Sequence, residues 1–212
     1  EDGGEPVGVA ETGEELHRAI TEREPRGELA EPAVHACEGE ERGGRAGPVL
    51  DALEELGCDD PLVHLAAWFH DAVYVGDPAA PAGQDEADSA ALARDVLTDP
   101  RLAVPADLVD EVARLVLLTA AHDPAPHDAA GAVFSDADLE VLGRSPEAYA
   151  RYVAAVRRDY AHVSDADWAR GRGAVLDALL DAERLYRTAP GRTRWEAAAR
   201  RNLAAERAAL SA

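Results

Sequence analysis

Apolar residues recur at helical spacing from residue 49 to the end of the chain, and this periodicity restricts the possible fold more than any other feature. Between residues 49 and 56, for example, Val49, Leu50, Leu53 and Leu56 fall on one helical face. Alanine is abundant, whereas the 212 residues include only three Trp, five Tyr and two Phe, so strand-forming runs are scarce. The sequence therefore predicts an all-α fold of closely packed helices.

Glycine, proline and aspartate separate the periodic segments. Gly57 is a natural end for the first helix, and Asp60-Pro61 is a typical start for the next one. Residues 76–83 and 122–131 are predicted to be loops. The predicted helices cover residues 49–56, 62–74, 85–97, 106–121, 136–143, 146–160, 165–182 and 192–210.

Residues 1–48 differ in composition from the rest of the chain. They contain no aromatic residue and nine of the seventeen glycines, and they repeat Glu and Gly without sustained periodicity. Such a segment buries little apolar area against the entropy lost on ordering. We therefore predict a poorly structured or atypical N-terminal segment at 1–48 and one helical domain at 49–212.

The charge balance argues against whole classes of partner. The chain has 21 basic and 42 acidic residues, a net charge of −21, whereas nucleic acids and anionic membrane surfaces bind basic proteins. It also has no apolar run of the ~18 residues that a membrane helix needs, and no signal-peptide pattern opens it. We expect a cytoplasmic protein with no bulk nucleic-acid or membrane partner; the sequence sets no oligomeric state.

The adjacent pair His70-Asp71 is the strongest chemical signal in the sequence. It is predicted to lie inside an apolar helix, where a buried carboxylate costs several kcal/mol unless it is paired or bound to a metal. Imidazole nitrogen and carboxylate oxygen are both good ligands for a divalent ion. A capping or ion-pair role is the alternative interpretation.

Two later segments strengthen the metal interpretation. Asp136 and Asp138 open another predicted helix; we assign Asp136 to capping its N-terminus and Asp138 to the metal. The loop before it contains His122, Asp123, His127 and Asp128. This loop either supplies a further ligand or a general acid, or is a polar loop with exposed histidines.

Several strings occur in order along the chain: AAWFHDAVY, DEADSA, SDADLEVLG, RRDYAHV, GRGAVLDALL and LYRTAPGRTRWEAAARRNL. Together they resemble a bacterial family of predicted metal-dependent phosphohydrolases in the HD superfamily. The resemblance extends from about residue 49 to residue 212, some three-quarters of the chain. It implies an HD-domain-like helical bundle that hydrolyses phosphomonoesters or phosphodiesters, often of nucleotides, with one or two divalent metals.

The resemblance also implies roles for individual residues. His70 and Asp71 match the signature metal ligands, and Asp138 matches the distal aspartate ligand. The mechanism that we infer from these residues adds a second role for Asp71, which orients the attacking water, while Glu86 or His122 carries the proton of that water.

Further matches lie toward the C-terminus. We predict that Arg172, a planar donor in an acidic protein, contacts the substrate phosphate, with a helix–helix salt bridge as the alternative. The sequence leaves open the roles of the remaining matches, which are Tyr160, Tyr186, Thr188 and Asn202.

The chain departs from the family pattern near its N-terminus. Family members carry a histidine ligand just before the first helix, but residues 41–47 contain no histidine, and His35 lies in a dissimilar context. Ala87 also replaces a second Glu that is common in the family. Either His35 substitutes through another path, or the site lacks one ligand, or the N-terminal sequence is altered by a frame error.

Mixed nitrogen and oxygen ligands suit Mn or Fe best, with Mg, Co, Ni and Zn as alternatives. The predicted function is a metal-dependent phosphohydrolase acting on a small phosphoester such as a nucleotide, in which the ion acts as a Lewis acid and activates water. The alternative is a degenerate HD domain that binds a nucleotide or a partner without catalysis. Two-iron oxygenase chemistry is a distant third, because it needs more histidines.

Overall fold

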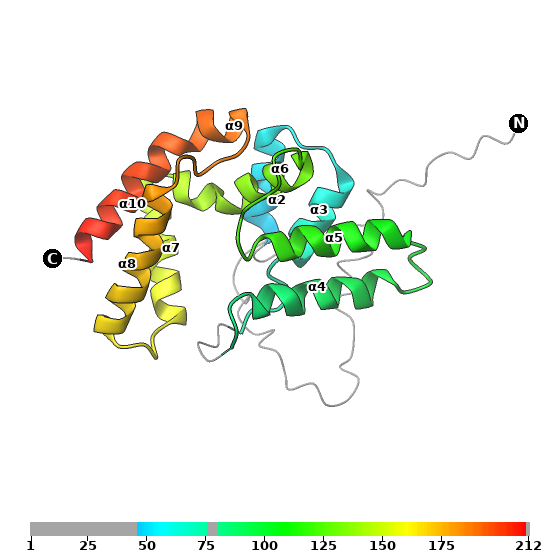
Figure 1. Cartoon of the computed structure of the whole chain (residues 1–212), viewed down its shortest axis with the longest axis horizontal. Coiled ribbons are helices and arrows are strands. Elements are labelled where there is room, and N and C mark those ends of the chain that lie inside the picture. The colour runs from blue at the N-terminus through cyan, green and yellow to red at the C-terminus, as the bar shows by residue number, and fades with distance from the viewer. Residues whose placement is uncertain (1–45, 76–79, 211–212) are drawn as a thin grey trace, which may run out of the picture. The chain divides into compact units, whose positions relative to one another are not determined.

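The structure is a computed structural model that describes residues 46–75 and 80–210. Throughout these two ranges the regular structure is helical, with no β-strand (Figure 1). The predicted all-α class is therefore confirmed. Residues 1–45 of the predicted N-terminal segment, His35 among them, lie outside the described residues. Residues 76–79 of a predicted loop lie outside them too.

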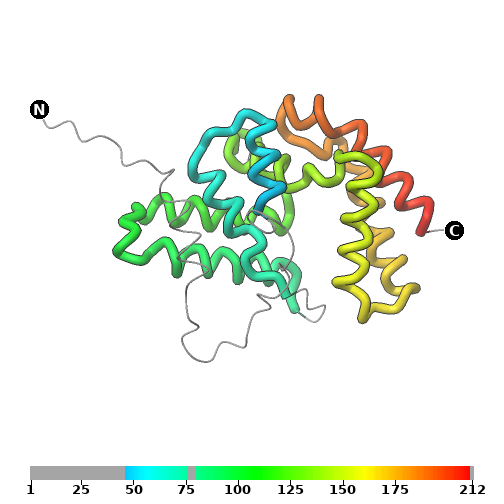
Figure 2. The backbone as a smooth tube through the Cα atoms, turned by 180° about the vertical axis from the view of Figure 1, so that it is seen from behind, coloured from blue at the N-terminus to red at the C-terminus, as the bar shows by residue number. Residues whose placement is uncertain are grey.

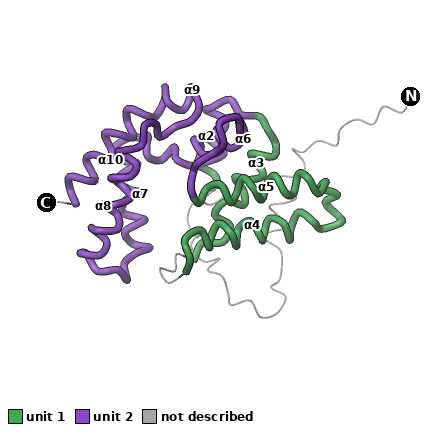
Figure 3. The backbone as a smooth tube through the Cα atoms, in the orientation of Figure 1, with its two compact units in different colours: residues 1–47, 59–75, 79–120 green, residues 48–58, 76–78, 121–212 purple. Residues whose placement is uncertain are grey.

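The chain divides into two compact units, which Figure 3 shows in different colours. Among the described residues, unit 1 contains 46–47, 59–75 and 80–120, and unit 2 contains 48–58 and 121–210. Each unit buries apolar side chains of its own.

Unit 1 is built from α3 (Pro61–Phe69), α4 (Gln84–Leu97) and α5 (Ala106–Leu118). Helices α4 and α5 lie side by side, and α3 packs against both, as the views in Figures 1 and 2 show. Alanines at the helix contacts let the backbones approach closely, and larger apolar side chains fill the remaining space. The fully buried core residues include Val63, Ala66, Ala67, Phe69, Ala93, Val112, Ala113 and Leu115.

Unit 2 contains most of α2 (Ala46–Leu56), whose first two residues belong to unit 1. It continues with α6 (Ala129–Asp138), the 3₁₀ turn η2 (Leu139–Gly143), α7 (Pro146–Asp159) and α8 (Asp165–Asp181). It ends with α9 (Ala189–Gly191), the π-helical turn η3 (Arg192–Glu196) and α10 (Ala197–Ala209). Helix α10 packs against α8 and η2, and η2 also contacts α6 and α7.

Two residues whose roles the sequence left open hold unit 2 together. The side-chain amide of Asn202 in α10 donates to the carbonyls of Leu142 and Arg144 at 2.8 and 3.0 Å, which ties α10 to the end of η2. The buried Tyr186 donates its hydroxyl to the carbonyl of Leu139 at 3.0 Å. Both side chains therefore satisfy backbone carbonyls at a helix end, where intrahelical partners are missing.

Polar residues begin five of the described helices, as expected for N-caps. Asp60 accepts a hydrogen bond from the backbone N–H of Leu62 at 2.9 Å, and Pro61 follows it, so the predicted start of α3 is confirmed. Ser145, Ser164, Asp128 and Thr188 cap α7, α8, α6 and α9 in the same way. At the other end of α2, Gly57 adopts a φ of 73°, which confirms it as the residue that ends this helix.

Helix α3 is shorter than predicted, and this changes the setting of the His-Asp pair. The helix ends at Phe69 with His70 as its C-cap, whereas a helix to residue 74 was expected. The backbone N–H of Val73 donates to Ser89 Oγ at 3.0 Å, and that hydroxyl donates to the carbonyl of Val73 at 3.1 Å. Because the serine of α4 satisfies both backbone groups, the chain leaves the helical path before it reaches Val73.

Other boundaries also differ from the prediction. Helix α5 ends at Leu118 and not at residue 121. Helix α6 begins at Ala129, inside the predicted loop, because Asp128 caps it by accepting from the N–H of Gly131 at 2.8 Å; it then tightens into η2 after Asp138. The last predicted helix begins three residues early, at Ala189, and includes the π turn.

Two buried serines give a matched test of these contacts. Ser89→Ala should lower the free energy of unfolding by about 1–3 kcal/mol, because it leaves two backbone groups of Val73 without their partner. Ser135 is also buried, but its Oγ has no hydrogen-bond partner in the described part of the chain, so Ser135→Ala should be neutral or stabilising. Urea denaturation of both variants measures the difference, and equal losses would contradict the role of Ser89.

Candidate functional site

In unit 1, His70 lies at the C-terminal end of α3, where the chain turns out of the helix. Its side chain is only 4% exposed, and its Nδ1 is 2.8 Å from the carbonyl of Ala67. Since a carbonyl only accepts, Nδ1 carries a proton, so Nε2 is the acceptor nitrogen of the neutral imidazole. Nε2 lies 3.9 Å from Oδ2 of Asp71, so the two predicted ligands point their heteroatoms to the same region.

The first turns of α4 hold the segment that comes after His70 and Asp71. Besides the contacts of Ser89 with Val73, Asp85 Oδ1 accepts from the backbone N–H of Val75 at 3.2 Å. Glu86, the predicted proton carrier, is half-buried in the same turn. The string DEADSA thus has a structural role through Ser89, a role that the sequence did not assign.

In unit 2, the structure brings His122 and Asp138 together. Nε2 of His122 is 2.8 Å from Oδ2 of Asp138, the last residue of α6, and both side chains are partly buried. The backbone of His122 has a φ of 50°, in the left-handed region that non-glycine residues enter rarely. Such a conformation persists only where surrounding contacts hold it, and it is a recognised mark of functional positions.

Asp136 has a different role from the predicted one. It does not cap the N-terminus of a helix: it lies near the C-terminal end of α6 and is completely buried. Its carboxylate accepts from the backbone N–H of Arg187 at 2.5 Å and from the N–H and Oγ1 of Thr188 at 2.8 and 2.6 Å. Burial raises the pKa of Asp136 above its ordinary value, against the opposing effect of these hydrogen bonds.

The structure places Arg172 in the helix–helix salt bridge that the sequence left as the alternative. Nε and Nη2 donate to the two carboxylate oxygens of Glu206 at 2.8 and 3.0 Å, and the hydroxyl of Tyr149 bonds to the same carboxylate. The side chains of Arg172 and Glu206 are only 9% and 7% exposed. This bidentate pair joins α8 to α10 and occupies the guanidinium that was predicted to contact phosphate.

The predicted ligands thus appear as two pairs, His70 with Asp71 and His122 with Asp138. Within residues 46–75 and 80–210, no group of three or more His, Cys, Asp or Glu side chains is arranged to hold a metal. The donor types nevertheless fit a divalent ion, and the orientation of His70 by a backbone carbonyl is the usual support of a metal-ligating histidine.

Sequence reasoning missed Arg187, whose guanidinium lies beside His122. Nη2 donates to the carbonyl of His122 and reaches Oδ1 of Asp123, both at 3.2 Å. The position carried a signal, since Arg187 stands between Tyr186 and Thr188 in the string LYRTAPGRTRWEAAARRNL, which the sequence had singled out.

Comparison with known proteins finds no family model, no curated protein and no solved structure that matches the chain. Among the described helices, none has the length and apolar character needed to cross a membrane.

The packing around Asp136 leads to a testable stability difference. A Cβ at position 191 would come within 3.0 Å of Cγ of Asp136 and 3.1 Å of Oγ1 of Thr188. Gly191→Ala should therefore cost about 1–3 kcal/mol, because the hydrogen-bonded carboxylate has little room to move. Gly171→Ala is the control: Gly171 is exposed in α8 and nothing lies within 4 Å of a Cβ built there, so helix propensity should stabilise this variant by up to about 1 kcal/mol. Thermal unfolding of both variants should show a lower Tm for Gly191→Ala and a higher Tm for Gly171→Ala than for the wild type.

Proposed function

We propose that the chain is a metal-dependent phosphohydrolase acting on a small phosphoester, with His70 and Asp71 as metal ligands, and with Asp138 added to them by the sequence resemblance alone. The observation that carries the proposal is the setting of His70. It is a buried imidazole next to a carboxylate, and the Ala67 carbonyl orients its ring so that Nε2 is the nitrogen on the side of Asp71. The sequence resemblance, which includes this pair and Asp138, points to the same chemistry.

A divalent ion bound by these residues would supply a Lewis acid for a phosphate oxygen and favour deprotonation of water. The protein residues have separate tasks. Asp71 orients the attacking water. Asp138 accepts from His122 through Oδ2, and a carboxylate has enough lone pairs to bind a metal at the same time.

His122 is the candidate general acid or base in this mechanism. Its Nε2 is hydrogen-bonded to the carboxylate of Asp138, which orients the ring, and imidazole is the side chain that most often transfers protons in enzymes. Glu86 is the second candidate for proton transfer, and a separate Glu86→Gln variant distinguishes the two. The residue that transfers the proton should change the pH profile of kcat when it is replaced.

The test is a panel of nucleotides and other phosphoesters with Mn, Fe, Co, Ni, Mg or Zn added singly. We expect metal-dependent turnover, and we expect Asp71→Ala and Asp138→Ala to lower kcat by at least about a hundredfold, since the metal contributes several kcal/mol to transition-state stabilisation. Asp110→Ala is the matched control, because Asp110 is exposed and pairs with Arg94 at 3.4 Å on the surface of unit 1. Full activity in Asp71→Ala would refute the proposed role of Asp71.

The second candidate function is a degenerate HD domain that binds a nucleotide or partner without hydrolysis. It is favoured by Ala87 in place of an acidic residue and by the absence of histidine from residues 41–47. Metal analysis of the purified protein separates the two functions. Stoichiometric metal with turnover supports the hydrolase, whereas a folded helical protein that binds nucleotide and shows no turnover with any metal supports the degenerate domain.

A further inference from the structure

Arg187 combines a reachable guanidinium with a position next to the candidate proton carrier. Nη2 donates to the carbonyl of His122 at 3.2 Å, and the side chain is 40% exposed. Its ion-pair partner Asp123 is 78% exposed, and an ion pair of two such groups in water contributes little free energy. An incoming anion can therefore replace the Asp123 carboxylate on the guanidinium at small cost.

The backbone of Arg187 is fixed on both sides. Its N–H donates to the buried carboxylate of Asp136 at 2.5 Å, and its carbonyl accepts from Nη1 of Arg192 at 2.6 Å. The next residue, Thr188, bonds to the other oxygen of Asp136. An arginine on a fixed backbone loses less entropy on binding a ligand than one on a mobile loop.

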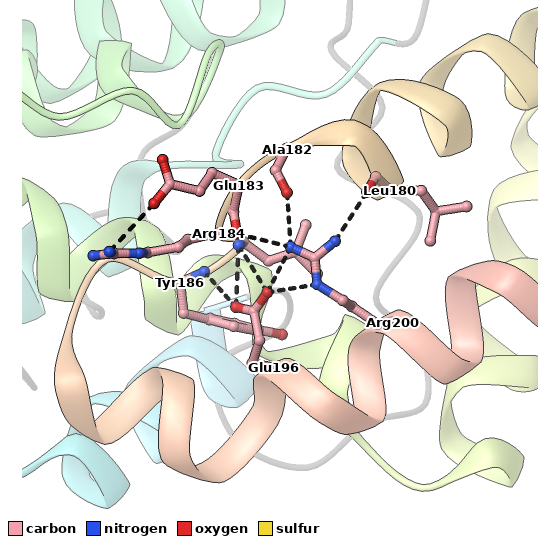
Figure 4. Close-up of polar contacts among 8 residues, drawn as sticks. Leu180, Ala182, Glu183, Arg184, Tyr186, Glu196 and Arg200 are labelled. Atoms are coloured by element: carbon pink, nitrogen blue, oxygen red, sulfur yellow. Dashed lines mark hydrogen bonds and ion pairs between the residues drawn. The ribbon is translucent and has the colours of Figure 1, made fainter.

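The segment just before Arg187 is held by a second cluster, which Figure 4 shows. Glu196 accepts from the backbone N–H groups of Leu185 and Tyr186 at 3.1 and 3.2 Å. Arg200 donates to Glu196 at 2.8 Å and to carbonyls of the preceding segment, among them that of Ala182 at 2.7 Å. These charge-assisted hydrogen bonds hold the chain that leads to Arg187 against η3 and α10.

We propose that Arg187 is a substrate-binding residue that contacts the phosphate of the substrate beside His122. This inference rests on the proposed function, and it assigns the phosphate contact to Arg187 in place of Arg172. A phosphate accepts two parallel N–H bonds from a guanidinium and carries more charge than the Asp123 carboxylate. The anion would then lie next to His122, the candidate general acid or base.

The experiment measures the Kd of inorganic phosphate by isothermal titration calorimetry, using full-length protein treated with EDTA so that metal does not contribute. Arg187→Gln should raise the Kd about tenfold or more, the effect expected for one bidentate charge-assisted contact. The Kd of Arg187→Lys should lie between those of the wild type and Arg187→Gln, because Lys keeps the charge but lacks the planar guanidinium. Asp123→Asn should lower the Kd, because it removes the competing carboxylate.

Arg184→Gln is the matched control, since it removes the same charge from the same segment, where Arg184 forms an exposed ion pair with Glu183 at 3.3 Å. Its Kd should stay within about twofold of wild type, a small free-energy change. Equal weakening in both Gln variants, or no phosphate binding by the wild-type protein, would overturn the proposal. If the Kd of phosphate depends on Arg187 but the protein shows no metal-dependent turnover, the proposed hydrolase function is refuted and the anion-binding role of Arg187 is retained.

Discussion

The arrangement around His122 depends on the hydrogen bonds of one buried carboxylate, that of Asp136. A carboxylate removed from water costs several kcal/mol unless donors replace the solvent. Here three hydrogen bonds from Arg187 and Thr188 do so. Asp138 lies two residues further along α6, about 200° around the helix axis, and contacts His122. One helix end therefore positions both a histidine and an arginine, through two carboxylates with opposite directions.

The helices were predictable because their signals are local. Caps such as Asp60, together with Pro61 and Gly57, set boundaries that the sequence displays directly. The end of α3 was not predictable, because Ser89, sixteen residues away, competes for the backbone of Val73. Periodicity contains no information on such a partner, so a helix through His70 and Asp71 was the natural interpretation of an apolar run.

The candidate site was predictable only in its residue types. The sequence singled out His122 and Asp138, which are hydrogen-bonded in the structure. It assigned Asp136 to capping a helix, whereas Asp136 accepts a hydrogen bond from the backbone of Arg187. For arginine the decisive property is tertiary: Arg172 is buried against Glu206, whereas Arg187 remains accessible. Composition gives both the same charge, and only their surroundings determine which of them an anion can reach.

The π turn η3 has a consequence for the evolutionary history of the C-terminal helix. A π turn closes i→i+5 bonds and so accommodates one residue more than an α-helix of the same rise. The extra residue rotates the remainder of the helix by about 100°. Glu196 lies at the end of this turn and Arg200 beyond it, and both form hydrogen bonds with the segment before Arg187. A homologue with a regular α-helix here would align with a one-residue gap between Arg192 and Glu196, and would need different side chains to hold that segment.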